Sequence, residues 1–155
     1  MERKRKIKKK NACGCGHCIY EIDGEYLNGK LNGKVKDYNK EQLLLFEGTY
    51  LNGLRDGKGK QYDHEDNLYN EVEYLNGRLW KGKSKEYIGE EFLIFDGAYE
   101  NGLRNGKAKE YDDEGILIFD GEYLNGKRWN GRGVEFDGNN LIFDGKYING
   151  EKVKE

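Results

Sequence analysis

The chain has no proline, and in 155 residues it has only three cysteines, two histidines and one methionine. The cysteines lie together between residues 13 and 18, unlike the distributed pattern typical of a disulfide-stabilised secreted domain. No apolar run approaches the length of a membrane span, and no hydrophobic signal region follows the basic start. These absences predict a soluble, cytoplasmic protein.

Large apolar residues are also scarce. Leu, Ile, Val and Phe account for 34 residues, about 22% of the chain, whereas 36% of the chain is charged. A conventional two-layer core is therefore not expected. Twelve tyrosines partly compensate, because their rings can pack while their hydroxyl groups stay hydrated.

A repeat dominates what is present. Each copy has an acid, in all but the third copy a glycine, then a tyrosine and, after one further residue, Asn-Gly. The tyrosines are spaced by 24, 24, 25, 24 and 24 residues, and they are Tyr26, Tyr50, Tyr74, Tyr99, Tyr123 and Tyr147. A constant period of this length indicates a repeat array, and such arrays usually bind rather than catalyse.

The repeat predicts a β-hairpin. Residues 116–123 form an extended segment before one Asn-Gly, which supplies the positive φ that a chain reversal needs. Alternation places Phe119 and Tyr123 on one face and Asp120 and Glu122 on the other. We expect the rings to lie over glycines of neighbouring strands, and lysines to lie beside acids.

The predicted fold is therefore all-β, an elongated single-layer antiparallel sheet of tandem β-hairpins with about eleven strands. Residues 1–19 are a basic, cysteine-containing arm that we expect to be flexible. Residues 20–155 hold six copies, of which the last is partial.

Two copies carry one extra residue after Asn-Gly, in segments 77–82 and 126–131. An insertion within a strand would turn every later side chain to the opposite face, so we expect a hairpin loop of about five or six residues here. Trp80 and Trp129 lie in these segments. They are the candidate partner-binding residues on one rim, unless each packs over its own hairpin. The repeat tyrosines Tyr50, Tyr99 and Tyr123 are further candidates, on the ring face.

Residues 46–60, Phe-Glu-Gly-Thr-Tyr-Leu-Asn-Gly-Leu-Arg-Asp-Gly-Lys-Gly-Lys, resemble the MORN repeat, and the resemblance covers about 22–150. The tail of each unit is closer to the variant MORN repeats of YwqK-like antitoxin-type proteins. The resemblance implies a row of hairpins used in scaffolding, self-association or attachment near membranes. The third copy departs from the pattern at Asn70 and Val72, where the other copies mostly have an aromatic residue and glycine, so a weak junction is expected there.

The ligand-type residues Cys13, Cys15, His17 and Cys18 suit zinc in chemistry. Four ligands within six residues are crowded and no second cluster exists, so metal binding, thiol reactivity and an ordinary linker all stay open. Carboxylate pairs such as Asp120 and Glu122 recur in equivalent settings, which argues against a catalytic pair. We therefore assign no catalytic, metal or cofactor residues.

Charge separates the arm from the array. Residues 1–10 carry seven Lys or Arg against one acid, and the remainder has 20 basic and 28 acidic residues. Nucleic-acid binding by the acidic array is not expected. The predicted function is a non-enzymatic protein-protein interaction scaffold that binds a protein partner or itself and takes no small-molecule substrate. The alternatives are a peripheral membrane module whose arm meets anionic lipid, and an antitoxin-like binder of a protein toxin.

Overall fold

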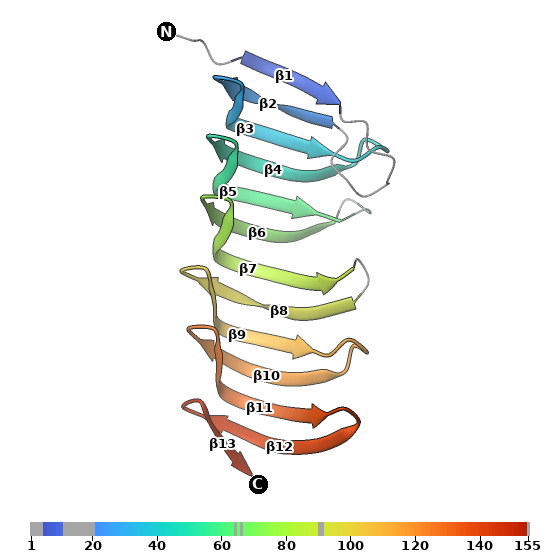
Figure 1. The fold of residues 1–155 in the computed structure, drawn as a ribbon, viewed down its shortest axis with the longest axis vertical. Coiled ribbons are helices and arrows are strands. Elements are labelled where there is room, and N and C mark those ends of the chain that lie inside the picture. The colour runs from blue at the N-terminus through green and yellow to red at the C-terminus, as the bar shows by residue number, and fades with distance from the viewer. Residues whose placement is uncertain (1–4, 11–20, 64, 66, 90–91, 155) are drawn as a thin grey trace. The chain divides into compact units, whose positions relative to one another are not determined.

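The computed structural model describes residues 5–10, 21–63, 65, 67–89 and 92–154. Every regular element in these ranges is a strand, and sequence neighbours are sheet neighbours (Figure 1). The strands are β1 (Arg5–Lys10), β2 (Glu21–Leu27), β3 (Lys30–Tyr38), β4 (Leu44–Leu51), β5 (Leu54–Tyr62), β6 (Leu68–Leu75), β7 (Arg78–Ile88), β8 (Phe92–Glu100), β9 (Leu103–Tyr111), β10 (Leu117–Leu124), β11 (Lys127–Asp137), β12 (Asn140–Ile148) and β13 (Glu151–Lys154). The prediction of an all-β, single-layer array of antiparallel hairpins is confirmed.

The chain divides into two compact units, and each is described by itself. Unit 1 spans Met1–Trp80 and unit 2 spans Lys81–Glu155. Unit 1 contains β1 to β6 and unit 2 contains β8 to β13, while the boundary lies within β7.

Each hairpin closes with a turn of only two residues, Asn-Gly. In the β4–β5 hairpin, Leu51 pairs with Leu54, and the residues between them, Asn52 and Gly53, have φ of 53° and 89°. Positive φ at both positions defines a type I′ turn, whose twist matches that of the flanking strands. The expected loop of five or six residues is therefore wrong, because the segment after Asn-Gly is already strand.

A bulge follows the turn in the β2–β3, β4–β5, β8–β9 and β10–β11 hairpins, and in β10–β11 it absorbs the extra residue of the longer copy. In β10–β11, the pair Glu122–Asn130 is followed by Tyr123–Arg128, so one residue of β11, Trp129, has no opposite partner. In the shorter β4–β5 hairpin, the pair Gly48–Gly59 is followed by Tyr50–Arg55. Between these pairs β5 has two more residues than β4. A bulge can thus return the later side chains of the strand to their correct face after an insertion, so no loop is needed.

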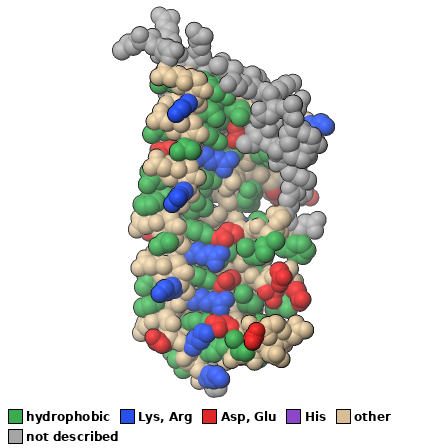
Figure 2. Space-filling view, viewed as in Figure 1, with side chains coloured by type: hydrophobic (Ala, Val, Ile, Leu, Met, Phe, Trp, Pro, Cys, Tyr) green, Lys and Arg blue, Asp and Glu red, His purple; other side chains and the backbone are tan. Residues whose placement is uncertain are grey.

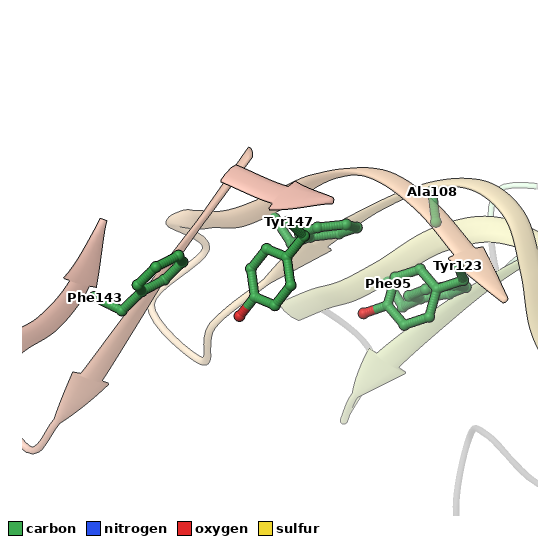
Figure 3. Packing of buried hydrophobic residues seen from close by; sticks show 6 residues of the cluster. Phe95, Ala108, Tyr123, Phe143 and Tyr147 are labelled. Atoms are coloured by element: carbon green, nitrogen blue, oxygen red, sulfur yellow. The ribbon is translucent and has the colours of Figure 1, made fainter. Parts of the chain in front are cut away.

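The core is a ladder of aromatic rings on one face of the sheet. In unit 2, Phe119 meets Tyr123 of its own strand edge to face at 5.4 Å and Tyr147 of the next copy at 5.5 Å. Figure 3 shows this cluster, in which Phe95 and Phe119 are almost fully buried. A Cβ placed on Gly133 of the neighbouring strand β11 would lie 3.1 Å from the Phe119 ring, so the ring rests on bare backbone of that strand as predicted.

The ladder of unit 1 is shorter. Phe46 contacts Tyr50 and Tyr74, both edge to face at 5.9 Å. In the third copy the ring position holds Asn70, which is buried and donates a hydrogen bond to the Gln61 side chain at 3.0 Å. The ladder of this unit therefore ends at Tyr74, and the unit boundary follows within the same copy.

The opposite face carries rows of charge. Lys109 lies opposite Asp120 in the register and forms an ion pair with it at 3.7 Å, and Lys36 pairs in the same way with Glu47 at 3.4 Å. Such exposed pairs each contribute roughly 0.2 to 1 kcal/mol. The predicted pairing of lysines with acids across strands is confirmed.

The two ends of the array differ from expectation. Residues 5–10 form β1, paired with β2 so that Lys6 and Lys8 stand opposite Glu25 and Asp23 in the register. The prediction of a flexible arm is therefore wrong for residues 5–10, since a basic strand can pair with an acidic neighbouring strand. The sixth copy also continues into β13, so the described residues form thirteen strands rather than eleven.

Candidate functional site

A polar row covers the aromatic ladder. In three copies an arginine lies over a buried Phe ring and contacts an acid, and in two of them it also donates to a tyrosine hydroxyl. We call this row the arginine ladder. Its members are Arg55, Arg104 and Arg128 with Lys152, the acids Asp37, Glu86, Glu110 and Glu135, and the hydroxyls of Tyr50, Tyr99, Tyr123 and Tyr147.

In unit 1 one group of the ladder is seen among the described residues. The Arg55 guanidinium lies 3.8 Å from the centre of the Phe46 ring and 3.7 Å from Asp37. The Tyr50 hydroxyl donates to Asp37 at 3.3 Å. The Asp37 side chain is fully buried, and its Oδ1 atom accepts no hydrogen bond. Burial raises the pKa of the Asp37 carboxyl, while the Arg55 charge and the Tyr50 hydrogen bond oppose that rise.

In unit 2 the groups join into a continuous chain of contacts. Arg104 grips Glu86 through two hydrogen bonds, at 2.7 and 3.2 Å, and reaches Glu110 at 3.8 Å. Arg128 binds Glu110 at 2.8 and 2.9 Å and donates to Tyr147 at 3.3 Å. Two-point contacts of this kind fix the direction of the arginine as well as its distance.

The ladder ends at Glu135. This carboxylate accepts a hydrogen bond from the Tyr147 hydroxyl at 2.5 Å and another from Lys152. The Lys152 ammonium lowers the pKa of Glu135, with the Tyr147 hydroxyl acting in the same direction. Burial and the hydrogen bond to Glu110 raise the pKa of Tyr123 to about 12. Glu135 is thus held ionised by fixed partners, an arrangement that stabilises the structure.

The third copy loses the charged members of the ladder together. Gln61 replaces the acid, Leu79 replaces the arginine, and Leu79 packs against the aromatic cluster of unit 1. A buried arginine without its acid would be strongly destabilising, so replacing both avoids an uncompensated charge.

Sequence reasoning missed this ladder, although the spacing carries its signal. The arginines lie five residues after the repeat tyrosines. The acids lie 13 residues before the same tyrosines, except Glu135, which lies 12 residues before its tyrosine. The expected loop of five or six residues contains these arginines, whereas the bulge keeps them within a strand. A loop would have left them no fixed partner.

The structure separates the predicted site residues. Tyr123 is buried, Tyr50 and Tyr99 are partly buried, and the hydroxyls of all three bind acids of the ladder. Their rings therefore support the fold first. Trp129 is also partly buried, with its indole 3.2 Å from the Cβ position of Gly150, so it covers the next Asn-Gly turn. Trp80 in β7 is 38% exposed and leaves the larger indole surface open to solvent.

Large apolar side chains are exposed at both ends of the hairpins of unit 2. The first set flanks the Asn-Gly turns, and we call it the Asn-Gly edge; it consists of Leu103, Leu124 and Ile148. The second set lies at the opposite ends of the hairpins, and we call it the aromatic-leucine row; it consists of the pairs Tyr87 and Leu93, Tyr111 and Leu117, and Phe136 and Leu141. Leu93 and Tyr111 are partly buried, and the other four are exposed.

Among the described residues, no three His, Cys, Asp or Glu side chains come together in a way that could hold a metal ion. Cys13, Cys15, His17 and Cys18 lie outside that part of the chain. The same part contains no helix with the length and apolar character needed to cross a bilayer. No protein-family model matches this chain, and no curated protein matches it in sequence.

Proposed function

We propose that this protein is a non-enzymatic interaction array, built from hairpins of the MORN type, that binds a protein partner through side chains exposed at the ends of its hairpins. One observation carries the proposal: at both hairpin ends of unit 2, large apolar side chains are 38–55% exposed although each stands in a rigid strand or beside one. Apolar groups fixed in place on a surface bind a partner with little loss of conformational entropy.

The polar groups support the same conclusion. The ring-face acids Glu86, Glu110 and Glu135 each have an arginine or lysine and a tyrosine as partners. Their settings repeat from copy to copy, whereas a catalytic group needs surroundings that differ from those of its equivalents. Repeated and satisfied polar groups are typical of a scaffold whose specificity lies in its exposed side chains.

The MORN assignment is part of this proposal. It is supported by the hairpin order, by the two-residue Asn-Gly turns, and by the rings lying over glycines such as Gly97 and Gly121. Each residue type in this order has a physical role in the structure. The aromatic residue and the tyrosine form the core, the glycine leaves room for a ring, and Asn-Gly forms the turn.

Affinity capture tests the function. The full chain and the variant Trp80→Ala/Trp129→Ala are immobilised in parallel and exposed to extract from the native source. Each captured protein is then purified and its binding to the full chain is measured by calorimetry. We expect at least one protein to bind directly and saturably. Sedimentation with anionic vesicles, for the intact chain and for a chain lacking residues 1–10, tests the membrane alternative.

The results separate the hypotheses. Direct binding of a protein that is lost in the tryptophan variant places the contact near the indoles. Binding that is retained in the variant assigns the contact to other exposed residues. If no captured protein binds directly once purified, or if only the vesicles bind, the interaction function proposed here is wrong.

A further inference from the structure

The aromatic-leucine row of unit 2 repeats one pair per hairpin. Tyr111 stands opposite Leu117 across β9 and β10, and Phe136 stands opposite Leu141 across β11 and β12. Leu117, Phe136 and Leu141 are 43%, 45% and 55% exposed. The row therefore offers a line of apolar contacts that crosses the strands at their ends.

The spacing of the row suits an extended chain. Successive hairpins are two strands apart, about 9.6 Å at a strand spacing of about 4.8 Å. An extended peptide advances about 3.3 Å per residue, so every third side chain recurs at about 10 Å. A peptide laid along the row could therefore place one apolar side chain against each pair.

Charge beside the row selects the sign of the ligand. The turn after β9 contains Asp113 and Glu114, and Asp137 ends β11 directly before the next turn; all three are exposed, and no Lys or Arg lies in these two turns. Figure 2 shows hydrophobic and acidic side chains along this margin of unit 2, while basic side chains lie nearer the middle of the visible face. A cationic segment complements this margin, and an acidic one is repelled.

We propose that the aromatic-leucine row binds an extended cationic segment of a protein partner, with a large apolar residue at every third position and Lys or Arg between. This proposal rests on the interaction function above and names its surface and its ligand chemistry. The apolar residues supply contact area at the pairs, and the basic residues bind the acidic turns.

The probe is a labelled synthetic peptide of about nine residues, long enough to span three hairpins, with Leu at every third position and Lys elsewhere. Binding to the full chain is measured by fluorescence anisotropy at low and physiological salt. The row variant is Leu117→Ser/Phe136→Ser/Leu141→Ser. Its matched control, Leu103→Ser/Leu124→Ser/Ile148→Ser, removes three side chains of similar exposure from the Asn-Gly edge. Circular dichroism confirms that both variants are folded.

We expect the row variant to weaken binding about tenfold or more and the control to change it by less than about twofold. Neutralising the turns with Asp113→Asn/Glu114→Gln/Asp137→Asn should weaken binding and flatten its salt dependence. An unchanged affinity in the row variant, an equal loss in both triple variants, or equal binding of a Glu-for-Lys peptide overturns the proposal.

Two further outcomes identify a different occupant or a different surface. If the peptide does not bind but the chain self-associates in sedimentation equilibrium, and only the row variant abolishes this, the occupant is a second copy and the cationic segment is wrong. If a purified partner binds the wild type and the row variant equally, the row is wrong while the interaction function stands. If no partner binds at all, the function itself fails.

Discussion

Removing the ring of Phe119 tests whether the aromatic ladder is the true core of unit 2. The side chain is 1% exposed, touches two tyrosine rings edge to face, and lies over Gly121 and Gly133. Truncating a fully buried Phe to Ala costs about 3–5 kcal/mol, and each aromatic pair accounts for about 0.5–1.5 kcal/mol of such a loss. We expect Phe119→Ala to lower the free energy of unfolding by about 4 kcal/mol.

Phe136→Ala is the matched control, because it removes the same ring from a position that is 45% exposed. We expect it to cost about 1 kcal/mol or less. Urea unfolding followed by circular dichroism measures both variants, with Phe119→Leu as a milder substitution in case the alanine variant does not fold. At a slope of about 1–2 kcal/mol per molar urea, the midpoint of Phe119→Ala should fall by about 2 M or more. Equal midpoints for the Phe119 and Phe136 variants would refute the ladder as the core.

Three further predictions concern the polar groups. Arg128→Met should cost about 2 kcal/mol in urea unfolding because the side chain is only 16% exposed and paired, whereas Arg132→Met, 59% exposed, should cost less than about 1 kcal/mol. Because the folded-state pKa of Glu135 is lowered, its stabilisation is present above the ordinary Glu pKa and is lost as pH falls through the folded value; in Lys152→Met, carboxylate NMR titration should show that pKa moving up, and no movement would contradict the assignment. Because the pKa of Tyr123 is raised to about 12, its contribution is complete below the ordinary Tyr pKa of 10.0 and is lost as pH rises toward 12. Burial also raises the pKa of other tyrosines, so ultraviolet titration should show several tyrosines ionising late, and a Tyr123→Phe variant should lose part of that late change.

Local sequence rules predicted the features of the hairpin unit that depend on single residues or on alternation along one strand. Asn-Gly predicted the chain reversals, since both residues tolerate the positive φ that the turns require. Alternation predicted that Phe119 and Tyr123 are buried and that Asp120 is exposed. It also predicted rings over glycines of the neighbouring strand, and a Cβ at Gly133 of β11 would lie 3.1 Å from the ring of Phe119.

The same rules failed where two strands must adjust to each other. The bulge around Trp129 exists only in the register of β11 against β10, so a single strand gives no sign of it. The arginine ladder depends on that bulge, because Arg128 meets Glu110 on a strand two positions away in the sheet. The position of Trp129 also depends on this register, since its indole lies over Gly150, and the role of the tryptophans as partner-binding residues stays a prediction.

The sequence by itself determined the period, the turns and the two faces, because these follow from the conformational limits of Asn-Gly and from the alternation of side chains along a strand. Only the tertiary structure decided which side chains of neighbouring copies meet. In the folded chain Arg104 contacts both Glu86 and Glu110, although these residues lie on different strands. Leu117, Phe136 and Leu141 stay exposed near acidic residues at the strand ends. The physical reason is that these contacts depend on the register in which neighbouring strands pair, and the sequence of a single strand does not specify that register.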